Sequence, residues 1–189
     1  EDGTIITLVA VWEKCDHIDT FVYTADGAIL TKSCTCLGFD ETITIKVPSD
    51  VVYDEEIHPA SLSSKNEEWM SLYTIKYEKN GEEVEPINAG VYTASISQGD
   101  VTAYAVFEIK KAEQSAPEVP TYEVLENILT VSEIADSETT GAKVIYQLAY
   151  QTAEKWYYPD FEYTNQFYLE LAYTNYNVFV AYEETENYK

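Results

Sequence analysis

Residues 86–97 read Pro-Ile-Asn-Ala-Gly-Val-Tyr-Thr-Ala-Ser-Ile-Ser. From Val91 to Ser97, larger apolar or aromatic side chains alternate with small or hydroxyl ones, which is the pattern of a β-strand with one buried face. The Asn88-Ala89-Gly90 stretch before it predicts a turn that needs the backbone freedom of glycine. We therefore interpret this stretch as a turn that leads directly into a strand.

The same signals recur along the whole chain. Asp26-Gly27 and Asn80-Gly81 are dipeptides typical of tight β-hairpin turns. One short helical turn is expected at residues 66–70. An all-β fold is expected, with strands at 4–12, 21–23, 28–34, 42–47, 51–53, 72–78, 90–97, 101–110, 121–124, 128–131, 143–150, 167–171 and 176–182.

The charge of the chain excludes one class of partner. The net charge is −23, from 34 acidic and 11 basic residues. Such a surface repels phosphate, so nucleic-acid binding is not expected, and docking on anionic lipid is disfavoured. No stretch approaches the roughly 20 apolar residues of a membrane helix, so no membrane insertion is expected in this segment. An export signal or anchor would lie outside these residues.

Several motifs resemble modules of bacterial surface proteins. The segment from Val52 to Ala112 resembles the MBG-type Ig-like domain, the last segment resembles a fibronectin type III-like module, and Leu8-x-Ala10-x-Trp12 resembles the end of a Listeria-Bacteroides (internalin-B-type) repeat. In the last module, Tyr176 resembles a tyrosine corner, whose hydroxyl ties a loop to the backbone. The motifs are Val52-Tyr53-Asp54, Ile75-x-Tyr77, Asn80-Gly81, Pro86-x-Asn88-Ala89-Gly90-x-Tyr92, Phe107-x-Ile109-x-Lys111-Ala112, Trp156, Leu171, Thr174-x-Tyr176-x-Val178 and Glu184-Thr185-x-Asn187-Tyr188.

These resemblances imply tandem Ig-like and fibronectin III-like β-sandwiches with a small N-terminal β-hairpin region. The expected domains are a strand and cysteine-containing hairpin at 1–47, an MBG-type Ig-like domain at 48–115, and a fibronectin III-like sandwich at 116–189. The proline-containing linker at 113–120 marks the second boundary. The resemblance implies a secreted or cell-surface bacterial protein, and it supplies no catalytic residues.

One cluster has the composition of a metal site. Cys15, His17, Cys34 and Cys36 include all three cysteines and one of the two histidines of the chain. Three thiolates and an imidazole form a complete tetrahedral set for structural zinc, although the one-residue spacings are tighter than usual. One disulfide, from Cys15 to Cys34 or to Cys36, is an alternative, and three reduced thiols are another. No other cofactor is expected.

Few residues offer other chemistry. With two histidines in the chain, nucleophilic machinery is not expected. Trp156, Tyr157 and Tyr158 could stack on sugar rings if exposed, but a buried Trp156 with tyrosines at the sheet edges is the commoner arrangement. A Lys–Asn amide crosslink assisted by an acid is a further hypothesis, although no spacing singles out the three residues.

The resemblances and the absence of catalytic motifs predict a non-catalytic extracellular spacer or adhesion segment. Its partners would be an extracellular protein or glycan and the neighbouring domains of the same chain. The alternative is a carbohydrate- or protein-binding module that uses the aromatic loop around Trp156, in the setting of a polysaccharide-degrading enzyme.

Overall fold

The computed structural model describes residues 21–34, 39–170, 173 and 175–189. The expected all-β fold is confirmed, because strands make up 51% of the structure and helix 2%. Contacts divide the chain into two compact units, which we describe separately. Unit 1 comprises residues 1–48, 59–84 and 93–107, and unit 2 comprises residues 49–58, 85–92 and 108–189. This division does not follow the borders expected near residues 47 and 115, and the three-domain organisation stays a prediction.

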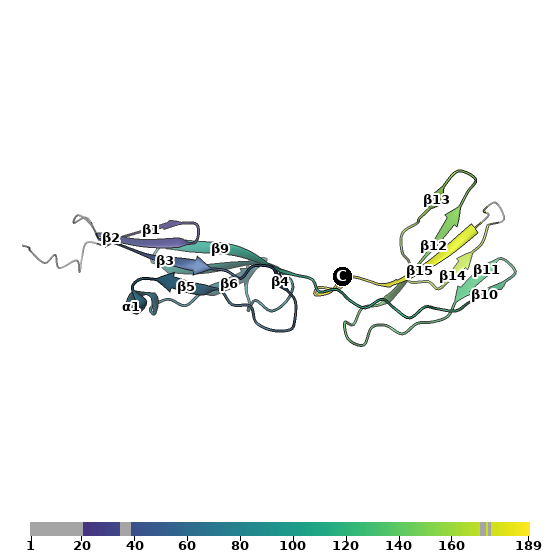
Figure 1. Cartoon of the computed structure of the whole chain (residues 1–189), viewed down its shortest axis with the longest axis horizontal. Helices are drawn as coiled ribbons and strands as arrows, with labels where there is room; N and C mark the ends of the chain where they lie inside the picture. The colour runs from purple at the N-terminus through teal and green to yellow at the C-terminus, as the bar shows by residue number, and fades with distance from the viewer. Residues whose placement is uncertain (1–20, 35–38, 171–172, 174) are drawn as a thin grey trace, which may run out of the picture. The chain divides into compact units, whose positions relative to one another are not determined.

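An antiparallel four-stranded sheet lies within unit 1 (Figure 1). Its first hairpin turns at Gly27, which has a φ of 52°, as the Asp-Gly signal predicts. Strand β3 pairs with β5, so the sheet extends across the border expected after residue 47. The strand order is β1 (Phe21–Asp26), β2 (Ile29–Cys34), β3 (Asp40–Lys46), β5 (Ser61–Ser64).

A second sheet contains the strand that follows the Asn88-Ala89-Gly90 turn. The hairpin between β6 and β7 turns at Asn80 and Gly81, whose φ values of 55° and 84° are those of the tight turn that Asn-Gly favours. Strands β8 and β9 contribute residues to both units. The order is β4 (Val51–Val52), β9 (Val101–Lys110), β8 (Gly90–Gln98), β6 (Lys76–Lys79), β7 (Glu82–Glu83).

The alternation of β8 is confirmed by its burial. One face of β8 is buried: Tyr92, Ala94 and Ile96 are 1%, 0% and 2% exposed. Val91, on the opposite face of the strand, is 56% exposed. The Tyr92 hydroxyl donates a hydrogen bond to the carbonyl of Asn88 at 2.8 Å, which ties the turn to the strand. The buried residues of β2, β3 and β9 include Leu30, Ile43, Ile45, Ala103, Phe107 and Ile109.

The expected helical turn is confirmed as α1 (Glu67–Met70). Asn66 caps its N-terminus, because its side-chain oxygen accepts a hydrogen bond from the backbone N–H of Trp69 at 3.0 Å. Trp69 is 6% exposed and anchors the turn in the core.

The C-terminal part of unit 2 contains two three-stranded sheets (Figure 1). One has the order β10 (Tyr122–Leu125), β11 (Ile128–Val131), β14 (Gln166–Tyr168), and the other has the order β13 (Trp156–Tyr157), β12 (Val144–Gln151), β15 (Asn175–Tyr182). Their core is built around Val131, Val144 and Tyr146, against which Ile134, Phe167, Val178, Val180 and Tyr182 pack.

The strands that local sequence does not predict are short. Strand β5 is almost entirely serine, so it lacks the apolar alternation that identifies a strand. Strands β7 and β13 have two residues each and exist because they pair with β6 and β12. Tertiary pairing, which local sequence does not encode, decides these elements.

Replacement of Gly90 by valine tests the turn before β8. Gly90 has a φ of 143°, a conformation that a β-branched residue avoids. We expect Gly90→Val to lower the free energy of unfolding by about 1–3 kcal/mol, measured by urea denaturation. Gly99→Asn is the matched control, since asparagine tolerates the φ of 58° at that position. A Gly90→Val protein that unfolds at the same urea concentration as the parent would contradict this role of Gly90.

Candidate functional site

Cys34 alone of the predicted zinc cluster lies within the described residues; Cys15, His17 and Cys36 lie outside them. Cys34 ends β2 and is disulfide-bonded. A disulfide sulfur is not a thiolate, so in this form Cys34 is not a zinc ligand. The structure therefore favours the disulfide alternative at this residue, and a zinc site in the reduced protein stays a prediction. Among the residues that the structure describes, no group of three or more potential ligands is placed to bind a metal.

The aromatic residues proposed to bind a ligand lie at and after β13. Trp156 is half-buried, whereas Tyr157 and Tyr158 are 37% and 59% exposed. The Tyr157 ring stacks on Tyr150 with centroids 5.4 Å apart, and the Lys155 ammonium lies 4.7 Å from the centroid of the same Tyr157 ring. Tyr157 thus already has two neighbours that compete with a sugar for its ring. Trp156 is half-buried and so is not enclosed in the core, and ligand binding by these three aromatic residues stays a prediction.

Tyr176 on β15 bonds the backbone of the preceding segment through its hydroxyl, and its assignment as a tyrosine corner stays a prediction. Its hydroxyl donates a hydrogen bond of 2.7 Å to the backbone carbonyl of Glu170. Burial raises the pKa of the Tyr176 hydroxyl, because ionisation there is less well solvated. The bond fastens the start of β15 to the loop after β14.

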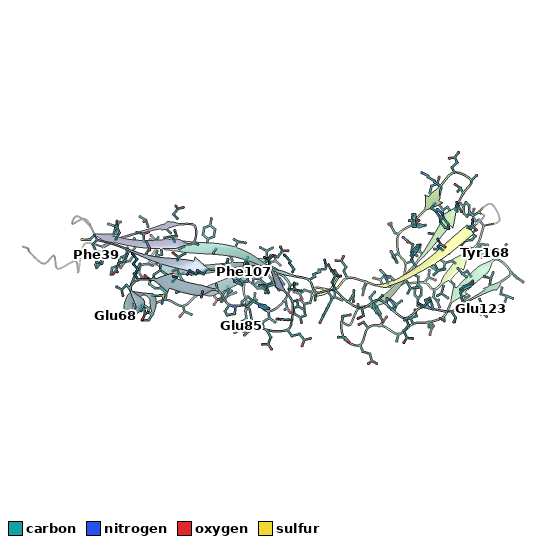
Figure 2. The ribbon with its side chains drawn as sticks, viewed as in Figure 1. Phe39, Glu68, Glu85, Phe107, Glu123 and Tyr168 are labelled. Carbon is teal, nitrogen blue, oxygen red and sulfur yellow. The ribbon has the colours of Figure 1, made fainter. Side chains whose placement is uncertain are left out.

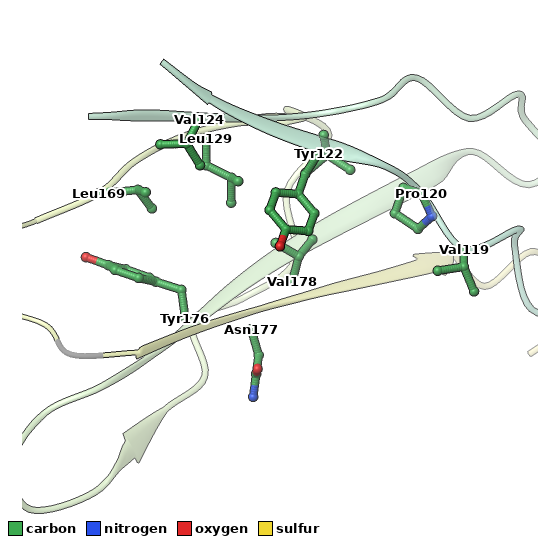
Figure 3. Close-up of a pocket in the computed structure, with 10 residues that line it drawn as sticks. Val119, Pro120, Tyr122, Val124, Leu129, Leu169, Tyr176, Asn177 and Val178 are labelled. Carbon is green, nitrogen blue, oxygen red and sulfur yellow. The ribbon is translucent and has the colours of Figure 1, made fainter. Parts of the chain in front are cut away.

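A groove opens between β10 and β15 (Figure 3). Its volume is about 490 Å³. Tyr122 and Val124 of β10 reach it from one side, and Val178 of β15 reaches it from the other. Both strands are sheet edges, because among the described residues β10 pairs only with β11 and β15 only with β12. Edge strands with an apolar groove between them can accept an added strand.

The C-terminal segment of unit 2, residues 183–189, pairs with residues 112–114, where the linker after β9 begins. The Ala112 N–H donates to the Asn187 carbonyl at 2.8 Å, and the Lys189 N–H donates to the Ala112 carbonyl at 2.9 Å. The Gln114 N–H then donates to the Lys189 carbonyl at 3.1 Å. The linker therefore begins as a hydrogen-bonded parallel pair and not as a free coil.

The side chain of Asn187 extends this contact to the turn before β8. Its Oδ1 accepts a hydrogen bond from the Ala89 N–H at 2.8 Å, and its Nδ2 donates to Oδ1 of Asn88 at 3.1 Å. Ala89 is 5% exposed, so Asn187 satisfies a buried backbone donor. Next to it, the Tyr188 ring packs edge-on against Tyr53, with centroids 5.4 Å apart. We call Tyr53, the turn 88–90, Ala112 and residues 187–189 the C-terminal clasp.

Ion pairs flank the clasp. Lys111 Nζ lies 2.9 Å from Glu184, and Lys189 Nζ lies 3.0 Å from Glu113. The hydrogen bond and the charge of Lys111 lower the pKa of the Glu184 carboxyl from its ordinary value. Because these groups are largely exposed, salt screens them, and they contribute little to the stability of the fold.

Both halves of the clasp are recognisable in the sequence, but their contact is not. The turn at Asn88-Ala89-Gly90 and the closing Asn187-Tyr188 were separate motifs of two resembled modules. Their separation of 98 positions leaves no local signal that Ala89 and Asn187 meet. The linker prolines predict a boundary, and they follow the hydrogen-bonded part of the linker, which ends at Gln114.

Comparisons of the chain with protein-family models, with curated proteins and with solved structures found no match. In the described part of the chain, no helix has the length and apolar character needed to span a bilayer.

Counting thiols decides between the alternatives for the cysteine cluster. With one disulfide at Cys34 and three cysteines in the chain, we expect one titratable thiol per chain in denaturant without reductant. The measurement is a thiol titration, paired with metal analysis of protein purified without chelator. Three titratable thiols with one bound zinc per chain would instead establish the metal site.

Removing the Asn187 carboxamide tests the clasp. Asn187→Ala leaves the buried Ala89 N–H without its acceptor, which we expect to cost about 1–3 kcal/mol of unfolding free energy. Asn187→Asp keeps an acceptor for that N–H and should lose less. Asn177→Ala, at an exposed residue of β15, is the control for loss of an asparagine side chain. Equal thermal stability of the Asn187→Ala and Asn177→Ala proteins would show that the clasp does not stabilise the fold.

Proposed function

We propose that this chain is a non-catalytic extracellular segment of a bacterial cell-surface or secreted multidomain protein, and that it acts as a spacer or adhesion module. The observation that carries the proposal is the clasp. Backbone hydrogen bonds hold the linker from Ala112 to Gln114 against residues 187–189, so the chain passes from β9 toward β10 without a free hinge at that point. A spacer needs such a fixed connection, because a flexible one does not hold its ends apart.

Two further observations support an extracellular setting. Cys34 is disulfide-bonded, and disulfides persist mainly in oxidising compartments. The carboxylates are dispersed, for example at Glu68 on α1, at Glu85 before β8 and at Glu123 on β10 (Figure 2). A dispersed negative surface favours solubility and opposes association between like-charged copies.

The distribution of distances across the linker tests the spacer. Two dyes, introduced through non-cysteine chemistry at exposed Ile57 and exposed Leu125 of unit 2, report this distance by single-molecule energy transfer. We expect one narrow distribution for the parent chain. Ala112→Pro removes the N–H that donates to the Asn187 carbonyl and should broaden the distribution. Ser115→Pro is the matched control, because no hydrogen bond involves Ser115 within the described residues. A broad distribution in the parent would contradict the spacer function.

A second candidate function is ligand binding, and the groove between β10 and β15 favours a protein ligand. Its two edge strands and its apolar lining suit an extended peptide that adds a strand to β15. For a carbohydrate ligand, the proposed binding surface is the aromatic loop around Trp156, Tyr157 and Tyr158. Glycan-array binding that is lost in a folded Trp156→Ala protein would support the carbohydrate, whereas peptide binding that is lost in a folded Tyr122→Lys protein, changed at an exposed residue of the groove, would support the groove.

A further inference from the structure

Unit 1 encloses a lysine at the end of its four-stranded sheet. The ammonium nitrogen of Lys32 lies 4.0 Å from the ring centroid of Phe21, 5.5 Å from that of Trp69 and 5.7 Å from that of Phe39. The Lys32 side chain is only 15% exposed. Phe39 and the helical turn that carries Glu68 lie at the same end of unit 1 (Figure 2). Lysine side chains are seldom buried this far without a specific partner.

That partner is Glu41, which lies directly opposite Lys32 in the β2–β3 pair. Its Oε2 lies 3.7 Å from Lys32 Nζ, while its Oε1 accepts a hydrogen bond of 2.8 Å from the side-chain nitrogen of Asn66. Oε2 is buried and, within the described residues, makes no hydrogen bond. One carboxylate thus lies between an amine and a carboxamide, with one oxygen toward each.

The carboxamide of Asn66 is also held at its other end. Its Oδ1 accepts the N-capping hydrogen bond from the Trp69 backbone N–H at 3.0 Å. A fixed donor on a carbonyl oxygen polarises the C=O bond and stabilises negative charge that develops on that oxygen. Asn66 Cγ is therefore an activated electrophile, and Lys32, whose Nζ lies 3.7 Å from Glu41 Oε2, is an amine beside the same carboxylate.

We propose that Lys32 and Asn66 form an intramolecular amide crosslink and that Glu41 transfers the protons. Glu41 Oε2 accepts a proton from the Lys32 ammonium, and the free amine then attacks Asn66 Cγ. Negative charge collects on Oδ1 beside the Trp69 N–H. Glu41 gives the proton taken from Lys32 to Asn66 Nδ2, and ammonia leaves as the Cγ–Nδ2 bond breaks. Glu41 then accepts the second proton of the attacking nitrogen and passes it to the ammonia. Lys32 ammonium and Asn66 carboxamide become a secondary amide and one ammonium ion, with no change in oxidation state and no co-reactant.

The surroundings of the three residues favour this reaction over a plain ion pair. The rings of Phe21, Phe39 and Trp69 keep water from the amine, which limits hydrolysis and holds the reacting groups together. A cavity of about 350 Å³, lined in part by Phe39, Glu41 and Asn66, provides an exit for ammonia. The crosslink would join β2 to the N-terminus of α1 across β3 and β5, which restricts the unfolded chain. The proposal does not depend on the function proposed above.

Intact mass tests the crosslink directly. The full chain is purified, reduced so that the cysteine disulfide does not contribute, and weighed under denaturing conditions. We expect a mass lower than that of the sequence by one ammonia molecule. A tryptic digest should contain one branched peptide that joins the segment around Lys32 to the segment around Asn66, with no cleavage after Lys32.

Three variants assign the roles. Lys32→Arg and Asn66→Ser should both show the full sequence mass; serine preserves the N-cap of α1, so the Asn66→Ser protein is expected to fold. Glu41→Gln should also keep the full mass while its circular dichroism stays that of a β-protein. Lys46→Arg and Glu67→Gln, at exposed neighbouring positions, are controls that should still lose ammonia. The full mass in the folded parent, with cleavage after Lys32, would overturn the proposal, as would ammonia loss that persists in Asn66→Ser.

Discussion

The carboxamide of Asn187 lies where three separate stretches of unit 2 meet. The carboxamide accepts a hydrogen bond from the buried Ala89 N–H of the turn before β8 and donates one to Asn88. The backbone carbonyl of Asn187 accepts a hydrogen bond from the N–H of Ala112, where the linker begins. A buried backbone donor without a partner is costly, so this side chain is not interchangeable with an apolar one of similar size. The paths of the linker and of residues 187–189 follow from this contact. The edge-on packing of Tyr188 against Tyr53 adds apolar burial around the same point.

Each unit contains a region where polar groups, and not only apolar burial, define the arrangement. In unit 2 these are the amide groups of the clasp; in unit 1 they are Lys32, Glu41 and Asn66. The two cases differ in chemistry. The clasp pairs neutral groups through ordinary hydrogen bonds, whereas the Lys32 cluster places a nucleophile, an acid–base group and an electrophile together among aromatic rings.

Much of the fold is predictable from the sequence, because its long strands carry clear periodicity. The alternation of β8 predicts the buried face of Tyr92, Ala94 and Ile96, and Asn80-Gly81 predicts a hairpin that the structure confirms. Short strands such as β5 are not predictable, since only their pairing partners define them. The two clusters are hidden for a related reason. Lys32 meets Glu41 through strand register, and Asn187 meets Ala89 through the return of the chain, so no fixed spacing encodes either contact.

Hydrogen exchange at three backbone amides measures the clasp most directly. The N–H groups of Ala89, Ala112 and Lys189 each donate to an acceptor within the clasp. If the clasp is a stable part of unit 2, these amides exchange as slowly as strand amides of β12 such as that of the buried Ala149, which lies opposite Asn177 of β15. If they exchange as fast as the amide of Ser115 in the open part of the linker, the clasp is not formed in solution and the fixed connection between β9 and β10 does not exist.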